Sequence, residues 1–355
     1  MHQPTTTDFP RTIGMDLGRR SSHYCVFETN HERGAEGQVP STRTAMRAFF
    51  KAQPTSRVVM EASGPCRWIA EEATAAGHEV VVANPREFRV ILTTHKKCDR
   101  NDARVLGDFG QFKPHLLHPI QLRGTKCQSA RTLLGSRAQI VSMRTELINM
   151  IGASIRDLGI EIGPRGASNT AYKRLTKYVP AELEDALLPL LGVLEKISKA
   201  IDEMDRSIER VSKEDFKETE VLRQVDGVGP ITALTFAATV EDPKRFKRSR
   251  DVGAYAGLVP RARSSSDSNP ELSISKRGDA AMRRSLVNAA TFILGPRGKD
   301  CDLRRWGVKL QERGGQRSRA KARIAVARKL AVLLHRLMLT GEVYDPDRQA
   351  NLAAA

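Results

Sequence analysis

Hydrophobic and polar positions in residues 11–125 alternate in short runs that predict an α/β unit. The segments RTIGMDLG and HYCVFET predict a strand, a turn and a second strand, and EGQVPS is a candidate third strand. The helical segments TRTAMRAFFKAQ and PCRWIAEEATAAG alternate with the short apolar strands RVVMEAS and EVVVANP. A further helical stretch runs from about Arg86 to Phe112. Hairpin strands followed by strand–helix alternation indicate an α/β sheet.

The spacing of apolar residues changes after this unit. Residues 128–160 and 181–213 carry apolar residues near heptad spacing with charges between them, and the Gly- and Pro-containing segment 161–180 joins them. We therefore expect an antiparallel helical hairpin with coiled-coil character. Two interpretations stay open. The pair is a spacer within one chain, or it is a dimerisation arm, since a pair this long cannot bury both faces on itself.

The chain from Val221 onward is mainly helical by its pattern. VLRQVDGVGPITALTFAATV predicts a helix, a Gly-rich turn and a second helix starting near Pro230. The basic stretch KRFKRSR, the segment VGAYAGLVP and the polar loop RARSSSDSNPELSIS follow, and further helices run from about Gly278 to Thr340. The expected divisions are residues 1–125, 126–216 and 217–345, with a tail at 346–355.

Positive charge is concentrated in one part of the chain. The 58 Lys and Arg exceed the 41 Asp and Glu by 17 overall. Residues 244–340 alone hold 24 Lys and Arg against 7 Asp and Glu, a difference of 17 that equals the whole net charge. A solvated basic surface is one interpretation, but attraction to nucleic acid explains the density better. Because only 5% of residues are aromatic, contact with a duplex backbone is favoured over base stacking.

Several features bear on location. The longest apolar runs are too short to span a bilayer, and residues 1–12 lack the apolar core of a secretion signal. The five cysteines are scattered and form no CxxC pair, so neither a zinc site nor a disulfide framework is indicated. We expect a cytoplasmic protein without a membrane partner.

Two acidic residues close apolar strands. Asp16 lies in IGMDLG and Glu61 ends VVMEASG, and a buried carboxylate is costly unless it is paired or binds metal. An acid at a strand end can also simply cap the next helix. The first and fourth strands are neighbours in a ribonuclease-H-like sheet, however, which would bring Asp16 and Glu61 side by side.

A second pair of acids lies in KKCDRNDARVLGDF. Asp99 and Asp102 are three residues apart, so on a helix they share one face with about 5–6 Å between Cβ atoms. Acids also favour helix starts, but like charges at this spacing suggest a cation between them. Four oxygen ligands suit Mg²⁺, and two such ions about 3.5–4 Å apart can clamp a phosphodiester.

The turn VDGVGPITA places Gly227 and Gly229 before the helix at Pro230. Free amides at such a helix start can bind a phosphate, and the pattern resembles a helix-hairpin-helix element. A plain helix–helix turn is the alternative.

The motifs together resemble one family. GMDLG, MEASG, Asn84-Pro85 and KxDxxDA (residues 97–103) occur in the order seen in DEDD-type transposases of the insertion sequence 110 family, and DGVGPITA, VGAYAGLVP and SISKRGDAAMRRSLVNAA are similar to its C-terminal transposase domain. The resemblance covers nearly the whole chain. It implies a RuvC-like, ribonuclease-H-like N-terminal domain, a coiled-coil insert and a C-terminal domain that supplies a nucleophilic serine. The catalytic, metal-binding residues it implies are Asp16, Glu61, Asp99 and Asp102.

The same resemblance implies a function. Such a protein is a nucleoid-associated, site-specific DNA recombinase of a bacterial mobile element, guided by a structured non-coding RNA called bridge RNA. It needs Mg²⁺, two ions in our expectation, and works on double-stranded element and target DNA as a dimer or tetramer.

The serine is less defined than the acids. The family's loop is commonly SSGG, whereas here it reads RARSSSDSN. Counting five residues from Pro260 gives Ser265, with Ser264 and Ser266 as alternatives. Two competing functions remain: a Holliday-junction-type nuclease that uses water, and a non-enzymatic nucleic-acid scaffold.

Overall fold

The computed structural model describes residues 11–29, 32–85, 99–163, 168–261, 272–315 and 317–348. The chain divides into two compact units, His2–Arg123 and Gly124–Ala355, and each is considered by itself. Within the described residues, no helix is both long and apolar enough to cross a membrane.

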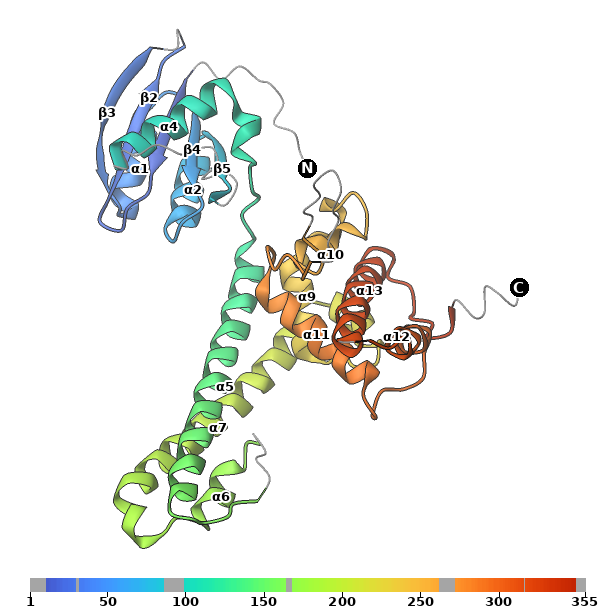
Figure 1. The fold of residues 1–355 in the computed structure, drawn as a ribbon. Coiled ribbons are helices and arrows are strands. Elements are labelled where there is room, and N and C mark those ends of the chain that lie inside the picture. Colours follow the sequence, from blue (N-terminus) through green and yellow to red (C-terminus); the bar gives the residue numbers. More distant parts are fainter. Residues whose placement is uncertain are drawn as a thin grey trace. The chain divides into compact units, whose positions relative to one another are not determined.

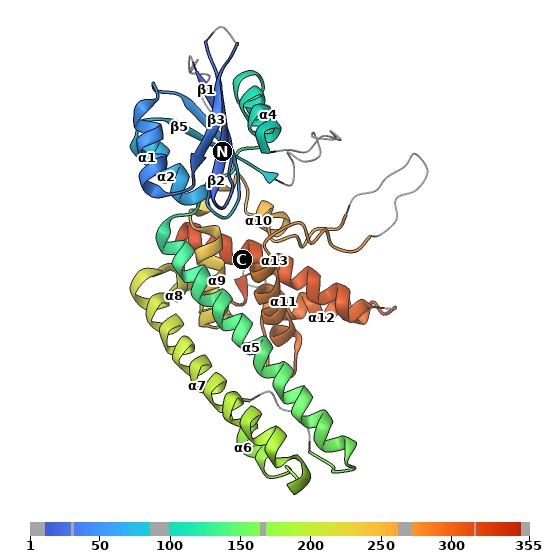
Figure 2. The ribbon, with the colours of Figure 1, turned by 90° about the vertical axis from the view of Figure 1, so that its left-hand side faces the viewer.

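The N-terminal unit is a mixed sheet with helices on both faces. The strand order is β3-β2-β1-β4-β5, in which β1, β4 and β5 are parallel and β2 is antiparallel to both β1 and β3. Figure 2 shows α1 and α2 on one side of the sheet and α4 on the other. The elements are β1 (Thr12–Asp16), β2 (Ser21–Phe27), β3 (Arg33–Pro40), α1 (Arg43–Ala52), β4 (Arg57–Glu61), α2 (Cys66–Ala75), β5 (Glu79–Ala83), α4 (Asp99–Phe112) and the short η1 (Pro114–Leu117).

Because side chains alternate along each strand, buried residues pack into cores on both faces of the sheet. Ile13 and Met15 of β1 pack with Val58 and Met60 of β4 in the core that also contains buried residues of α1 and α2. Val59 of β4 belongs to a separate core with α4. Such a sheet fits a ribonuclease-H-like domain, and the strands and helices expected from the pattern are confirmed. Residues 86–98 of the expected long helical stretch lie outside the described residues.

The second unit begins with a helical hairpin. α5 (Thr125–Asp157) and α7 (Glu184–Asp215) lie side by side and antiparallel, with α6 (Ala171–Thr176) and the short η2 (Ala181–Leu183) between them in sequence (Figure 1). The tip of the hairpin, where the end of α5, α6 and the start of α7 pack together, has its own hydrophobic core. Between this tip and the opposite end of the hairpin, its base, Arg137 of α5 pairs with Asp205 of α7. The expected pair of long helices is confirmed, and its coiled-coil character stays a prediction.

The base of the hairpin shares a core with the C-terminal helices. Cys127 and Leu134 of α5 and Ile208 of α7 are buried in the same cluster as the apolar residues of α9, α11 and α13. The expected division between residues 216 and 217 stays a prediction. The helices are α8 (Glu218–Leu222), α9 (Pro230–Val240), η3 (Pro243–Arg245), α10 (Asp251–Tyr255), α11 (Ala280–Leu294), α12 (Asp302–Glu312) and α13 (Ser318–Thr340).

Candidate active site

The carboxyl ends of β1 and β4 lie side by side. The two strands are parallel, and their last paired residues are Met15 and Met60, so Asp16 and Glu61 follow directly in adjacent strands. On the other side of β1, Asp16 is paired with His23 of β2. The strand order thus brings together the two acids that the sequence places 45 residues apart.

Both acids belong to the face of the sheet that α4 covers. Met15 and Met60 are fully buried in the core of the opposite face. Because successive side chains of a strand point to opposite faces, Asp16 and Glu61 point toward the α4 side. Both residues are only partly exposed.

Glycines allow α4 to lie directly on β1. A Cβ atom added at Gly14 would come within 2.1 Å of the carbonyl oxygen of Ala103 and 2.3 Å of the nitrogen of Gly107. A Cβ at Gly110 would similarly meet Val59 and Thr12. These contacts show that α4 runs opposite to β1, so its first turn lies at the end of β1 that carries Asp16.

That first turn holds the other two predicted acids, Asp99 and Asp102. Burial, and then the charges of Asp99, Asp102 and Glu61, raise the pKa of Asp16 to about 6, while His23 acts in the opposite direction. The other three carboxylates are therefore close enough to Asp16 to influence its charge. The like charges destabilise the ionised form of Asp16.

The four side chains are the kind of ligand that a hard divalent cation prefers. All four side chains offer carboxylate oxygens, which Mg²⁺ prefers, and a cation would offset their mutual repulsion. Within the described part of the chain, no three His, Cys, Asp or Glu side chains converge closely enough to hold a metal ion as they stand. The residue types fit the ion, although the side chains would have to close around it.

Sequence reasoning missed Glu36, which anchors α4. This residue of β3 accepts hydrogen bonds from Arg104, at 2.6 and 2.8 Å, and from Arg100 at 2.9 Å. The bonds from Arg104 lead the effects that lower the pKa of Glu36 to about 2. Arg100 and Arg104 are four residues apart and alternate with the acids Asp99 and Asp102, and that spacing was the available signal.

The predicted Gly-rich turn packs against α11. Gly227 has a φ of +82°, and a Cβ there would meet Phe292 and Ile293. Gly229 caps the start of α9, while the basic stretch that begins at Lys244 lies beyond the other end of that helix. The 11 residues of α9 correspond to about 16 Å, which separates the basic stretch from this turn. A helix-hairpin-helix role stays a prediction.

Other predicted residues are outside the described residues. These are Lys97 of the KxDxxDA motif and the candidate nucleophiles Ser264, Ser265 and Ser266.

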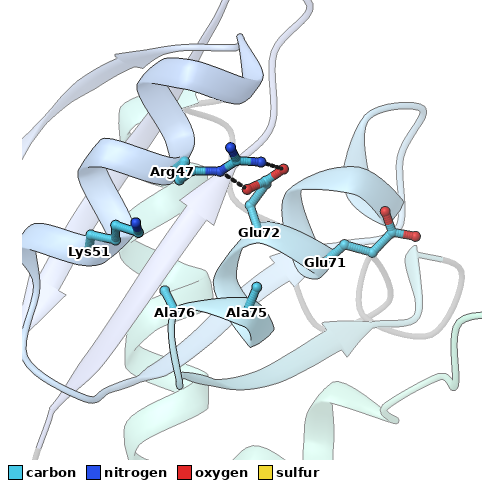
Figure 3. Close-up of a pocket in the computed structure, with 6 residues that line it drawn as sticks. All are labelled: Arg47, Lys51, Glu71, Glu72, Ala75 and Ala76. Carbon is cyan, nitrogen blue, oxygen red and sulfur yellow. Dashed lines mark hydrogen bonds and ion pairs between the residues drawn. The ribbon is translucent and has the colours of Figure 1, made fainter.

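An open pocket of about 410 Å³ lies between α1 and α2 (Figure 3). Its lining includes Glu72, whose carboxylate accepts hydrogen bonds from Arg47. Because α1 and α2 cover the face of the sheet opposite α4, this pocket is separate from the four acids.

The chain is similar to known transposases along most of its length. A family model described as "Transposase" matches residues 13–158, and that of the "Transposase IS116/IS110/IS902 family" matches residues 219–300. The first match contains Asp16, Glu61, Asp99 and Asp102.

Individual relatives agree with these matches. The transposase for insertion sequence element IS1328 of Yersinia enterocolitica is 30% identical over 79% of this chain and 83% of its own length. The transposase for element IS1111A of Coxiella burnetii is 28% identical over 94% of this chain and 91% of its length. A probable family 20 transposase of Pseudomonas aeruginosa is 27% identical over 94% of this chain and 98% of its own length. Matches on both units and relatives that align over most of their length show that the chain belongs to the IS110 family of DEDD transposases.

Proposed function

We propose that this transposase cuts and rejoins DNA at a centre formed by Asp16, Glu61, Asp99 and Asp102. The observation that carries the proposal is that the carboxyl ends of β1 and β4, with Asp16 and Glu61, meet the first turn of α4, with Asp99 and Asp102. A fold gains nothing from gathering like charges on one half-buried surface, whereas perturbed acids of this kind concentrate at functional sites.

The four carboxylates would hold the metal. Mg²⁺, in our proposal two ions, would supply positive charge that stabilises the scissile phosphate when bound. Asp16 and Glu61 come from the rigid sheet, and Asp99 and Asp102 from the first turn of α4. The protein's own contribution is to fix these oxygens at one end of the sheet, with Glu36 holding α4 through its two arginines.

We propose Ser265 as the nucleophile, on the family's spacing from Pro260. Its oxygen would form a bond to phosphorus as the bond from phosphorus to the leaving DNA oxygen breaks, and the serine proton would end on that oxygen or on water. The phosphodiester energy is kept in a serine–DNA bond until a new DNA hydroxyl displaces the serine. Ser264 and Ser266 are the alternatives, since the glycines of the family's loop are replaced here.

We also propose that a structured non-coding RNA guides the enzyme and that it works as a dimer or tetramer. The family resemblance and the excess of 17 positive charges in residues 244–340 support an RNA partner. Sequencing of RNA that copurifies with the protein tests this: RNA encoded beside its own gene is the expected result, and random cellular transcripts would count against a guide.

Supercoiled DNA carrying the element ends, incubated with Mg²⁺ and the protein together with its copurified RNA, tests the proposed function. A covalent protein–DNA adduct that survives denaturation and disappears in Ser265→Ala is the expected result. Peptide mapping of the adduct distinguishes Ser265 from its two neighbours. Free ends without an adduct would indicate a nuclease that uses water, and no breakage at all would indicate a scaffold.

A further inference from the structure

A strongly basic loop connects α9 to α10 in the second unit. Residues 243–250 read PKRFKRSR and carry five positive charges and no acid. Lys244, Lys247, Arg248 and Arg250 are exposed. Of these, Arg248 makes an ion pair with Asp251 at 3.4 Å.

A buried histidine holds the two ends of this loop. His335 of α13 is completely buried; its Nε2 lies 2.9 Å from the carbonyl oxygen of Pro243 and its Nδ1 lies 3.0 Å from the hydroxyl of Ser249. A carbonyl can only accept, so Nε2 carries the hydrogen and donates it to Pro243. In the neutral ring Nδ1 then accepts from the Ser249 hydroxyl. One side chain thus fixes both the first residue of the loop and its seventh.

Aromatic contacts fix the middle of the loop. The ring of Phe246 packs edge-to-face on His335 and on Tyr255, with centroids 5.5 and 5.3 Å apart. The Arg245 guanidinium lies 4.7 Å from the rings of both Phe246 and Tyr255, and it donates to the Thr239 carbonyl at 3.2 Å. Arg245 and Phe246 therefore support the loop from inside, while the other cations remain at the surface.

The geometry points to a binding surface for the phosphate backbone of a DNA duplex, formed by the exposed cations of loop 243–250 and positioned by His335. This inference rests on the proposed DNA-cutting function and adds a location for part of the DNA contact. A preordered set of cations loses little conformational entropy on binding. The single aromatic residue of the loop, Phe246, packs inside rather than being offered to bases, which favours a duplex over a single strand.

The test measures binding of the full chain to a fluorescein-labelled DNA duplex of random sequence, in EDTA so that no strand is cut. The loop variant carries Lys244→Gln, Lys247→Gln and Arg250→Gln. A matched control carries Lys196→Gln, Arg210→Gln and Lys217→Gln, which removes two lysines and one arginine that are also exposed. We expect the loop variant to bind at least about tenfold more weakly, with the slope of log Kd against log salt reduced by about 0.9 per lost contact.

Two further variants test the role of His335. Ser249→Ala disturbs the fold least and should weaken binding about fivefold, the effect of one lost hydrogen bond. His335→Gln also removes the ring that packs on Phe246, so it should weaken binding at least as much. If His335 acts through the loop, neither change should weaken binding further in the loop variant. A general structural role would weaken binding in both backgrounds and would overturn the positioning role.

The remaining outcomes separate this inference from the proposed function. A loop variant that binds DNA like the wild type overturns the loop surface and leaves the transposase function intact. A wild-type protein that binds no DNA duplex overturns both. A loop variant that loses binding only to a structured RNA duplex, measured in parallel, overturns the assignment to DNA.

Discussion

The two faces of the N-terminal sheet place acidic residues in opposite electrostatic surroundings. On the face covered by α1 and α2, Glu72 is only 5% exposed and lies between Arg47 and Arg43, whose hydrogen bonds lower its pKa. On the α4 face, Asp16 is half-buried among other acids, and its pKa rises to about 6.

The difference separates acids that stabilise the fold from acids for which we propose a role in chemistry. Pairing with arginine favours the charged form of Glu72, so the charge contributes to the stability of the folded unit. The charge of Asp16 is disfavoured in the folded state, so the fold alone does not account for it. Glu36 combines both roles, because it is paired with arginines and yet holds the helix that carries Asp99 and Asp102.

The largest effect is expected for Asp16→Asn. Strand cleavage should fall at least about a thousandfold, since the variant removes one of the four carboxylates that we propose bind metal. The melting temperature without divalent metal should hold or rise, because the change also removes like-charge repulsion. Gel assays of plasmid cleavage and thermal melts measure the two quantities.

Asp108→Asn is the matched control for this variant. Asp108 lies on the same helix as Asp102, is exposed and undergoes the same chemical change. It should retain wild-type cleavage. Full activity in Asp16→Asn would remove Asp16 from the site, and the same criterion applies to Glu61→Gln, Asp99→Asn and Asp102→Asn.

An intermediate effect is expected for Glu36→Gln. The neutral amide keeps the shape of the side chain but weakens its hydrogen bonds with Arg100 and Arg104. The first turn of α4 is then held less firmly against β3. Cleavage should fall about 10- to 100-fold, the range found for residues that orient metal ligands, and the Mg²⁺ concentration needed for half-maximal rate should rise. An unchanged Mg²⁺ requirement would show that Glu36 acts on the fold alone.

A smaller effect is expected for Gly14→Ala, which also disturbs the position of α4. The new methyl group would lie 2.1 Å from a backbone oxygen of α4, which cannot move aside without shifting the helix. We expect a loss of about 1–3 kcal/mol in the free energy of unfolding, measured by urea denaturation. Gly135→Ala on α5 is the control, because it has open space around it and should be neutral or stabilising by up to about 1 kcal/mol.

The smallest effect is expected for Glu72→Gln. The variant leaves Arg43 and Arg47 without their shared charged partner, so the melting temperature should drop by a few degrees while cleavage stays at the wild-type level. A large loss of cleavage in Glu72→Gln would contradict the division between the two faces.

The sequence was sufficient for features that follow from local periodicity. Buried strands ending in Asp16 and Glu61, the long helices α5 and α7, and the start of α9 at Pro230 were all predicted correctly. Periodicity does not report which distant surfaces meet. The ion pairs of Glu36 join residues of β3 and α4 that are 64 and 68 positions apart in sequence. The contact of Gly14 with Ala103 depends on two backbones coming together.

Closeness in sequence does not by itself give closeness in the fold. The Gly227 turn and the basic stretch are separated by a single helix, and a rigid helix places its two ends apart. The proposed role of the basic stretch in binding the DNA backbone depends on His335, which is 86 residues away from Ser249 in sequence.

The continuous α5 links two independent cores, and this has a consequence for how the second unit opens. Its first turns are buried with the C-terminal helices, and its last turns pack at the tip with α6 and α7. Cooperative opening units usually follow such cores rather than helix boundaries. In native-state hydrogen exchange, amides of this single 33-residue helix should therefore fall into two classes, with the tip exchanging through a partial opening that leaves the base protected.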